Sequence, residues 1–349
     1  MAARTAIGLD IGTSSIRAAQ LTVSKGAVTL DRFGQVAIPP GVVRDGEVID
    51  SDAVAEALKH LWSSAKFSQK DVVLGISNQK VFVRQVDIPW MPAGELKNSL
   101  KFQVADLLPM PVEEAVLDFV VLNEVMNEGA RHLRGLLVAA SQDMVLGSIR
   151  ACQKAGLKVT TADLTPFAVL RAAGTTDPMG LSGPEAVVDV GARVTNIVVH
   201  EGGVPQFVRI LLLGGDDVTG AIVERLGISA VEAERLKRSP GALSSPAAAD
   251  ARRVVDAALA EFVDEVRGSV DYFLATSGSR PLTRLVLSGG GSLADGLAQR
   301  LATAVRTQVE YGRPFSRLTI GKTGLAAQQV QLVEPLAAVP VGLAMGAMS

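Results

Sequence analysis

Apolar segments alternate with turn residues at the beginning of the chain, in a pattern typical of β-strands. The segments Ile7–Ile11, Ile16–Val23 and Ala27–Ile38 are mainly apolar, and the turn-forming residues Gly12–Ser15 and Lys25-Gly26 separate them. We therefore predict three strands joined by tight turns. The first is a short apolar run of the kind that is buried on both faces of a sheet.

A helix and another strand are predicted next. Apolar residues recur at helical spacing at Val54, Leu58 and Leu61, and Ser51-Asp52 before them is a typical helix N-cap. The short apolar run Val72–Ile76 has the length and composition of a buried strand.

The pattern changes between Val81 and Thr161, where strands and helices no longer alternate regularly. We predict strands and helices there at Val81–Ile88 (strand), Pro92–Leu107 (helix), Ala115–Val125 (strand), Arg131–Ala140 (strand), Gln142–Ala155 (helix) and Lys158–Thr161 (strand). This block is predicted to be a compact α+β unit inserted into an α/β frame.

The second half of the chain repeats the plan of the first. Gly, Thr, Pro and Ser crowd into Gly174–Pro184, so we place a domain boundary there. Strands are predicted at Ala186–Val190, Thr195–His200 and Gln206–Leu213, and a long helix at Ala247–Ala275. Two domains of similar plan predict an α/β protein with a cleft between them.

Composition excludes several classes of protein. Among 349 residues 48% are hydrophobic, 4% are aromatic and the net charge is −2, which argues against disorder and against nucleic-acid binding. A single cysteine, Cys152, excludes a disulfide framework. The longest uncharged run, Pro335–Ser349, is shorter than the roughly 20 residues of a spanning helix. We therefore expect a cytoplasmic protein that does not insert into a membrane.

The candidate chemistry lies in two matching turns. Asp10-Ile11-Gly12 and Asp189-Val190-Gly191 each end a buried strand and begin a short turn. A carboxylate at the end of a buried strand needs a partner such as a metal ion, and consecutive turn N–H groups can bind an anion. The hydroxyls of Thr13, Ser14 and Ser15 would add donors. One such turn is ordinarily just a capped turn, but two at equivalent places indicate a shared site.

A third turn is rich in glycine. Gly289, Gly290 and Gly291 follow the apolar run Leu285–Leu287 and precede a helix predicted at Leu293–Ala304. Glycines at this point permit close backbone packing against a nucleotide. The spacing is not that of a dinucleotide-binding fingerprint, because its last glycine is missing.

The order of these motifs resembles the actin-like ATPase superfamily. Gly8–Leu21 is similar to its first phosphate loop, Val187–Val199 to the second, Leu285–Leu297 to the adenosine loop and Val341–Gly346 to the closing helix. The resemblance implies a two-domain actin-like fold whose cleft binds ATP or ADP with Mg²⁺, positioned by Asp10 and Asp189.

The resemblance also implies an adenosine site. Gly214-Gly215, followed by a helix with Glu234, Lys237 and Arg238, is similar to the pattern of chaperone ATPases. In that pattern the Glu and Lys hold the ribose and adenine, and the Arg lies against the base.

Within the superfamily the sequence resembles the PilM family of type IV pilus assembly proteins, relatives of the division protein FtsA. The segments that carry this resemblance are Val83–Pro89, Glu95-Leu96, Leu107–Pro109 and Leu117–Phe119. FtsA-like proteins usually continue into a linker and an amphipathic helix, whereas this sequence stops at Ser349, which favours PilM. The implied subdomains are 1–80 (1A), 81–161 (1C), 162–180 (1A), 181–216 (2A), 217–282 (2B), 283–330 (2A) and 331–349 (closing helix of 1A).

One position departs from the superfamily pattern. Thr165 stands where a Gln or Glu usually orients the attacking water, and a hydroxyl cannot act as a carboxylate base. The sequence therefore predicts ATP binding with weak or absent hydrolysis.

The family resemblance implies an adaptor function. The protein would bind the cytoplasmic tail of the inner-membrane protein PilN between subdomains 1A and 1C, in a type IV pilus or a related type II secretion system, and so be recruited to the inner face of the membrane. Leu96, Leu100, Leu108 and Met110 are candidates to line that groove, with plain helix packing inside 1C as the alternative. An FtsA-like filament former, which self-associates, and a small-molecule kinase are the competing functions.

Overall fold

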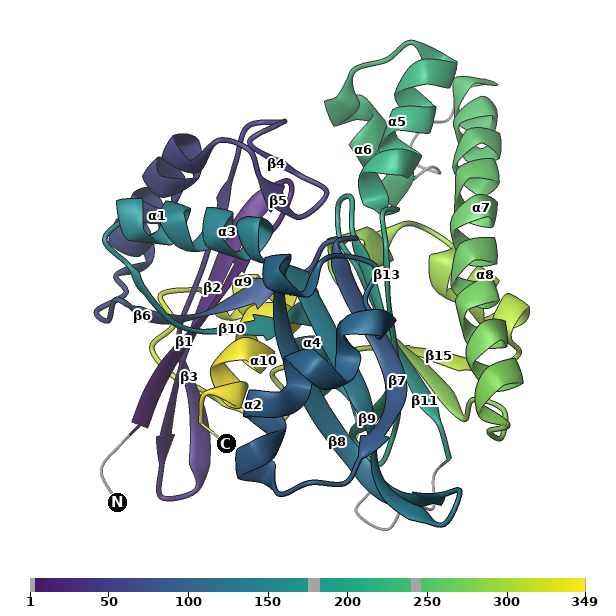
Figure 1. The fold of residues 1–349 in the computed structure, drawn as a ribbon. Helices are drawn as coiled ribbons and strands as arrows, with labels where there is room; N and C mark the ends of the chain where they lie inside the picture. The colour runs from purple at the N-terminus through teal and green to yellow at the C-terminus, as the bar shows by residue number, and fades with distance from the viewer. Residues whose placement is uncertain (1–3, 175–182, 240–245, 349) are drawn as a thin grey trace.

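Four β-sheets form the framework of the protein, counted over residues 4–174, 183–239 and 246–348, which the computed structural model describes (Figure 1). The first is six-stranded, in the order β10-β6-β1-β2-β3-β16. Its strands are β1 (Arg4–Ile11), β2 (Ser15–Ser24), β3 (Ala27–Ala37), β6 (Asp71–Ile76), β10 (Lys158–Leu164) and β16 (Thr319–Ile320). The three strands predicted at the start of the chain are therefore confirmed, as is the buried strand β6.

Helices α1 (Ser51–Ala65) and α3 (Gln142–Lys154) pack together and contribute to one hydrophobic core with this sheet (Figure 1). The predicted N-cap of α1 is wrong by one residue. The Asp50 carboxylate accepts hydrogen bonds from the backbone N of Asp52 (3.0 Å) and of Ala53 (2.9 Å). Asp50 caps the helix because its backbone is extended, so its side chain can reach the exposed N–H groups of the first turn.

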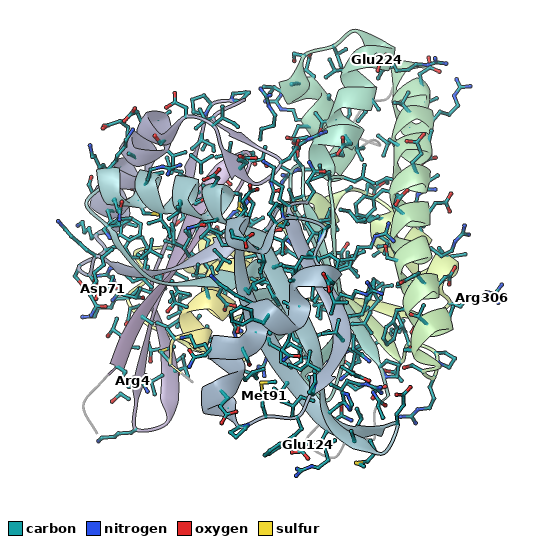
Figure 2. The ribbon with its side chains drawn as sticks, in the orientation of Figure 1. Arg4, Asp71, Met91, Glu124, Glu224 and Arg306 are labelled. Carbon is teal, nitrogen blue, oxygen red and sulfur yellow. The ribbon has the colours of Figure 1, made fainter. Side chains whose placement is uncertain are left out.

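The second sheet is five-stranded, in the order β13-β12-β11-β14-β15. Its strands are β11 (Glu185–Val190), β12 (Thr195–Glu201), β13 (Val204–Leu211), β14 (Arg284–Ser288) and β15 (Gln308–Tyr311). The helices of this half are α5 (Gly215–Leu226), α6 (Ala230–Arg238), α7 (Pro246–Ser277) and α8 (Leu297–Val305). Glu224 on α5 and Arg306 after α8 mark this half in Figure 2.

Two helices join the sheets. Side chains of α4 (Thr165–Ala173) and α10 (Ala338–Gly346) share one hydrophobic core with residues of both sheets, including Leu21 and Val187. The approach of α10 to β1 is so close that a Cβ added at Gly8 would lie 2.0 Å from the carbonyl oxygen of Pro340. Helix α9 (Ala327–Val333) precedes α10. The actin-like α/β architecture predicted from the sequence is therefore held together at its centre by one hydrophobic core that both main sheets share.

Only part of the predicted α+β block Val81–Thr161 forms a separate unit, with a three-stranded sheet in the order β7-β9-β8. The predicted extent of the block is too long, because β10 pairs with β6 in the first sheet and α3 packs on α1. The elements of the separate unit are β7 (Val81–Pro89), α2 (Ala93–Val104), β8 (Ala115–Asn127) and β9 (Ala130–Ser141). Met91 and Glu124 lie on this unit in Figure 2. A small hydrophobic cluster that includes Ile88, Leu100 and Phe119 holds α2 to the sheet.

Some predicted boundaries differ from the structure. The helix expected at Leu293–Ala304 is a 3-10 turn, Gly290–Leu293, followed by α8 from Leu297. Gly296, with φ of 77°, interrupts the helical path between them. In the boundary segment Gly174–Pro184, residues 175–182 lie outside the described part of the chain, as does the division at 180/181. None of the helices in the described part is long and apolar enough to cross a membrane.

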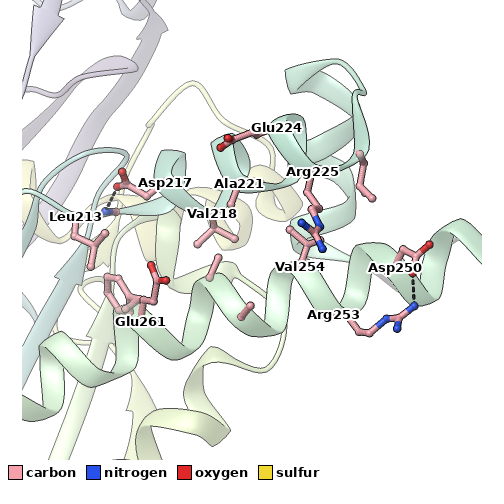
Figure 3. Close-up of a pocket in the computed structure, with 15 residues that line it drawn as sticks. Leu213, Asp217, Val218, Ala221, Glu224, Arg225, Asp250, Arg253, Val254 and Glu261 are labelled. Carbon is pink, nitrogen blue, oxygen red and sulfur yellow. Dashed lines mark hydrogen bonds and ion pairs between the residues drawn. The ribbon is translucent and has the colours of Figure 1, made fainter.

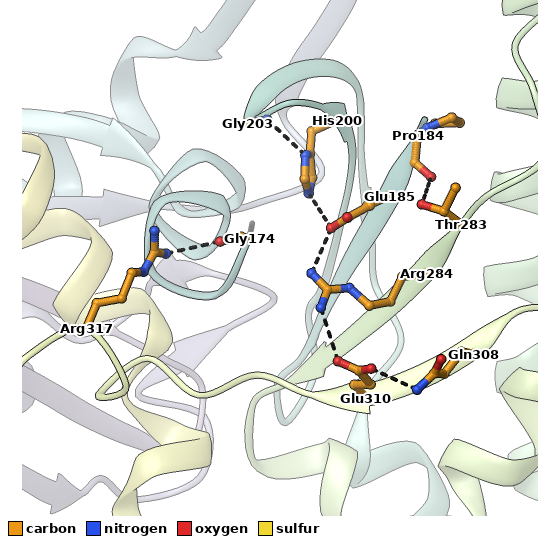
Figure 4. Close-up of polar contacts among 10 residues, drawn as sticks. All are labelled: Gly174, Pro184, Glu185, His200, Gly203, Thr283, Arg284, Gln308, Glu310 and Arg317. Atoms are coloured by element: carbon orange, nitrogen blue, oxygen red, sulfur yellow. Dashed lines mark hydrogen bonds and ion pairs between the residues drawn. The ribbon is translucent and has the colours of Figure 1, made fainter. Parts of the chain in front are cut away.

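A polar network lies at the start of β11, in which Glu185 and His200 are buried and Arg284 and Glu310 are partly exposed (Figure 4). Arg284 forms ion pairs with Glu185 (2.9 Å) and Glu310 (3.1 Å), while the ring Nε2 of His200 is 3.7 Å from Glu185. The backbone N of Gly203 donates to His200 Nδ1, so the proton of the neutral ring is on Nε2. Burial lowers the pKa of His200, an effect that the charge of Glu185 opposes.

Candidate functional site

The ends of corresponding strands in the two main sheets meet at a cavity of about 70 Å³. From the first half it is lined by Asp10, by the turn Gly12–Ser15 and by Thr165. From the second half it is lined by Asp189 and Gly191. The structure thus brings together the two predicted phosphate turns and the predicted water-orienting position.

Asp10 is paired with an arginine that the sequence analysis missed. Arg17 lies opposite Asp10 in the antiparallel register of β1 and β2, and its guanidinium is 3.3 Å from the carboxylate. Burial raises the pKa of Asp10, and Arg17 opposes that shift. The antiparallel hairpin itself contained the signal, because a tight turn after Gly12 places Arg17 beside Asp10.

The turn after β1 leaves polar atoms without partners. The backbone N of Gly12 donates to the carbonyl oxygen of Ser15 at 3.1 Å and closes the turn. The Ser15 hydroxyl and the Arg17 Nε are buried, and neither has a hydrogen-bond partner in the described part of the chain. Because orphaned buried polar atoms are costly, these groups beside the cavity fit a polar ligand.

The second turn repeats this geometry. The backbone N of Gly191 donates to the carbonyl oxygen of Val194 at 2.9 Å, as Gly12 does to Ser15. Asp189 lies between Asn196 on β12 and Ser288 on β14 in the register of the sheet. Burial, followed by the charge of Asp10, raises the pKa of Asp189 to about 6, although hydrogen bonds from Ser288 and Asn196 oppose the rise.

These residues fit a magnesium ion with a phosphate. Magnesium prefers oxygen ligands and keeps several waters, so Asp10 and Asp189 could hold it through water. Arg17 and the turn donors would face the phosphate oxygens. Thr165, the first residue of α4 and 4% exposed, contributes a hydroxyl at the same cavity. The cavity has room for a few waters but not for a triphosphate, so nucleotide entry requires the two halves to separate.

The predicted adenosine residues also gather, beside this cavity. Lys237 on α6 is 3% exposed, and its ammonium group contacts Glu234 (2.6 Å), the carbonyl oxygen of Gly215 (2.9 Å) and the hydroxyl of Thr219 (3.0 Å). Lys237 therefore fastens α6 to α5. Arg238 is half exposed and pairs with Glu234 at 2.9 Å.

The glycine-rich turns complete this region. A Cβ added at Gly215 would lie 3.1 Å from the Lys237 ammonium and 3.3 Å from the Cα of Gly291. Gly289 precedes the 3-10 turn Gly290–Leu293, which contains Gly291, and Gly214 precedes α5. Gly215, Gly291 and Lys237 are thus close neighbours.

A second and larger cavity, of about 990 Å³, lies along α5 and α7 (Figure 3). Gly214 and Asp217 lie at its edge, and side chains such as Glu224 and Arg253 line its length. It holds neither Asp10 nor Asp189, so the smaller cavity is the candidate site on chemical grounds.

The residues predicted to contact a partner lie on or after α2. Leu100 is 5% exposed and packs inside the cluster that holds α2 to its sheet, together with the partly buried Leu96 and Leu108. Met110 is also partly buried. For Leu100 this placement favours the alternative of plain helix packing.

The fold and the site define an actin-like protein. A solved structure of MreB5 of Spiroplasma citri bound to AMPPNP has a TM-score of 0.52 at 13% identity, covering 97% of this chain and 94% of that one. Cell division protein FtsA of Bacillus subtilis is 23% identical over 257 residues, which are 67% of this chain and 58% of FtsA.

The family is narrower than this class. The family model for type IV pilus assembly protein PilM matches residues 8–348, and the chain belongs to that family. A structure of a PilM–PilN type IV pilus biogenesis complex has a TM-score of 0.85 at 28% identity, covering 99% of this chain and 98% of that one.

Proposed function

We propose that this PilM-family protein is a cytoplasmic adaptor that binds ATP with magnesium between its two main sheets and docks the tail of a PilN-like membrane protein. The observation that carries the proposal is the similarity, over 99% of the chain, to a protein solved in a PilM–PilN complex. The proposed subdomains are those expected from the sequence, including the return of the closing helix 331–349 to 1A, except that α3 and β10 are assigned to 1A with the first sheet.

The proposed nucleotide site uses groups from both halves. Asp10 and Asp189 would hold magnesium through water, and the turns at Gly12–Ser15 and Gly191–Val194 would face the phosphates. Groups from both halves of the molecule would therefore contact the charges of bound ATP and magnesium. Glu234 would meet the ribose, for which it would have to exchange its contacts to Thr219 and Lys237.

Calorimetric titration with ATP, in magnesium and in chelator, tests this site. Asp10→Asn and Asp189→Asn should each weaken binding in magnesium at least tenfold and have little effect in chelator, because each removes a carboxylate from the cation. Asp106→Asn, an exposed carboxylate outside the cavity, is the matched control. Unchanged affinity in both cavity variants would contradict the assignment.

The partner proposal rests on the partly buried residues after α2. Leu108 and Met110, which belong to subdomain 1C, retain exposed surface, whereas Leu100 is enclosed. We propose that the PilN-like tail covers this surface, between 1A and 1C, and so recruits the protein to the inner face of the membrane.

A tail-peptide binding assay tests the partner surface. Met110→Ser should weaken binding of a PilN-like tail peptide several-fold. Phe102→Ser is the control, because Phe102 is 85% exposed on α2 and is not part of the proposed surface. A loss of binding in the Phe102 variant alone would move the docking surface to the outer face of α2.

A further inference from the structure

Arg193 connects the two halves of the molecule at the edge of the candidate site. It lies in the turn Gly191–Val194 between β11 and β12, and its guanidinium forms ion pairs with two carboxylates. One is Asp217 on α5, in the same half of the molecule. The other is Asp45, from the first half, whose Oδ1 is 3.5 Å from the Arg193 Nε. Arg193 is thus a direct charged contact across the cleft.

Asp217 is the fixed partner of Arg193. Its Oδ2 accepts a hydrogen bond from the backbone N of Gly214 at 2.7 Å, at the start of α5, while its Oδ1 accepts from Arg193. One carboxylate therefore holds both a helix N-terminus and the guanidinium. This arrangement anchors Arg193 to the second half of the molecule.

Asp45 is the partner that can be released. It occupies the tip of a small hairpin, β4 (Val43–Arg44) and β5 (Glu47–Val48), where Asp45 and Gly46 both have positive φ, 51° and 82°. The backbone carbonyl of Asp45 accepts from the Asn78 side chain, which fixes the tip to the first half. Its Oδ1 is buried without a hydrogen-bond partner in the described part of the chain. The ion pair with Arg193 is therefore the contact that balances this oxygen.

The hairpin tip and the Arg193 turn form a wall between two cavities. The inner one is the candidate site of about 70 Å³, lined by Gly46 and Ala192. The outer one, of about 380 Å³, is lined by Asp45 and Arg193, which are the chain neighbours of Gly46 and Ala192 in the same two turns. Thr13 and Ser14 line both cavities. Separating Asp45 from Arg193 would therefore open the inner cavity into the outer one.

A second polar contact crosses the cleft beside this wall. The Ser77 hydroxyl donates to the side-chain carbonyl oxygen of Asn196 at 2.6 Å, and both residues line the inner cavity. This contact is uncharged, whereas the Arg193 contact is charged. An incoming phosphate would compete with Asp45 for the guanidinium, because both are anionic.

We propose that Arg193, held by Asp217 and releasable from Asp45, is the clasp that keeps the phosphate end of the cleft closed and sets the rate of nucleotide exchange. The exchange step rests on the proposed nucleotide binding, whereas the closure does not. Arg193 and Asp45 are 37% and 26% exposed, so their contact is partly screened by water. A clasp of this strength slows opening several-fold and does not lock the cleft.

A distance measurement on the nucleotide-free protein tests the closure. Spin labels at Glu56→Cys on α1 and Gly220→Cys on α5 occupy exposed positions in the two halves. We expect Asp45→Asn to broaden the label distances and lengthen their mean, since Asn tolerates the turn but has no charge. Glu47→Gln is the matched control, because Glu47 pairs with Lys80 within the first half. Equal distributions in Asp45→Asn and the unsubstituted protein would overturn the clasp, whether or not nucleotide binds.

Stopped-flow exchange of a fluorescent ATP analogue tests the kinetic role. Asp45→Asn should raise the association and dissociation rate constants by about threefold to fivefold and leave the affinity within about twofold, as expected for loss of a partly exposed ion pair. Magnesium-dependent binding with unchanged rates in this variant would overturn the clasp and leave the nucleotide site standing. Altered label distances with no nucleotide binding in any variant would support the clasp as a closure and refute the nucleotide site.

Discussion

The carboxylates of Asp10 and Asp189 line one cavity from corresponding strands of the two sheets, and the charge of Asp10 raises the pKa of Asp189. The protonation of Asp189 therefore depends on the charge of Asp10. A carboxylate whose pKa is raised by burial and by a second carboxylate costs the protein free energy when it ionises, and a cation between the two would offset that cost. The site therefore lowers the stability of the folded protein when no cation is bound.

The first prediction concerns pH and Asp189. Its pKa rises from 3.8 in the unfolded chain to about 6 in the folded protein, so the folded state binds the extra proton between these values. Folding is therefore favoured at low pH by this group and loses that contribution as pH rises through about 6. Asp189→Asn should raise the melting temperature at pH 8, by an amount equivalent to roughly 1–3 kcal/mol, and should change it little at pH 4.

Thermal unfolding at both pH values in chelator checks this prediction. Asp106→Asn is again the control and should change the melting temperature at neither pH. A lower melting temperature for Asp189→Asn at pH 8 would show that the hydrogen bonds from Ser288 and Asn196 outweigh the burial of the charge.

The second prediction concerns His200, whose effect on the pH dependence of folding stability is opposite to that of Asp189. Because burial lowers its pKa in the folded protein, the unfolded chain binds the proton more readily, and this residue destabilises the fold as pH falls below about 6.5. His200→Gln should therefore lose less stability than the unsubstituted protein between pH 7 and pH 5. Melting temperatures across that range provide the measurement, with His60→Gln on the exposed side of α1 as control. Parallel pH profiles for His200→Gln and the unsubstituted protein would refute it.

The third prediction concerns Lys237. Lys237→Met removes a buried ammonium that joins α6 to Gly215 and Thr219 on α5, and should cost roughly 1–3 kcal/mol, because it leaves the carbonyl oxygen of Gly215 without this donor. Arg238→Met, at a half-exposed position that also pairs with Glu234, should cost less than about 1 kcal/mol. Denaturant titrations of both variants without nucleotide separate this structural role from ligand binding. Similar costs in the two variants would mean that the burial of Lys237 contributes little.

The fourth prediction concerns the rate of hydrolysis. With Thr165 in place of a water-orienting Gln or Glu, turnover should lie far below the roughly 10 s⁻¹ median of enzymes. Thr165→Glu should raise phosphate release when the cleft closes on nucleotide, and Thr165→Ala should leave the low rate nearly unchanged. A steady-state phosphate assay measures both. A rate of several per second in the unsubstituted protein would assign water activation to another residue.

Local patterns were sufficient to predict the strands that end at Asp10 and Asp189, because an apolar run followed by Asp-x-Gly is a signal within a few residues. The Asp10–Arg17 pair was also accessible, since antiparallel register across a tight turn defines it. The Asp45–Arg193 contact was not, because it joins turns that are distant in sequence and meet only after the sheets pack. The cap of α1 was misplaced because Asp50, Ser51 and Asp52 are all good capping residues and only backbone conformation distinguishes them.

The second sheet is inserted within the chain of the first, since β11 to β15 lie between α4 and β16. From Glu185 to Val190 the five residue steps of β11 span about 17 Å, so a rotation of about 10° about the start of this strand would move its far end by roughly 3 Å. Arg193 lies in the turn that follows this far end, so it would move at least as far. A small angular change between the two halves would therefore be enough to separate Arg193 from Asp45, whose charged groups are 3.5 Å apart.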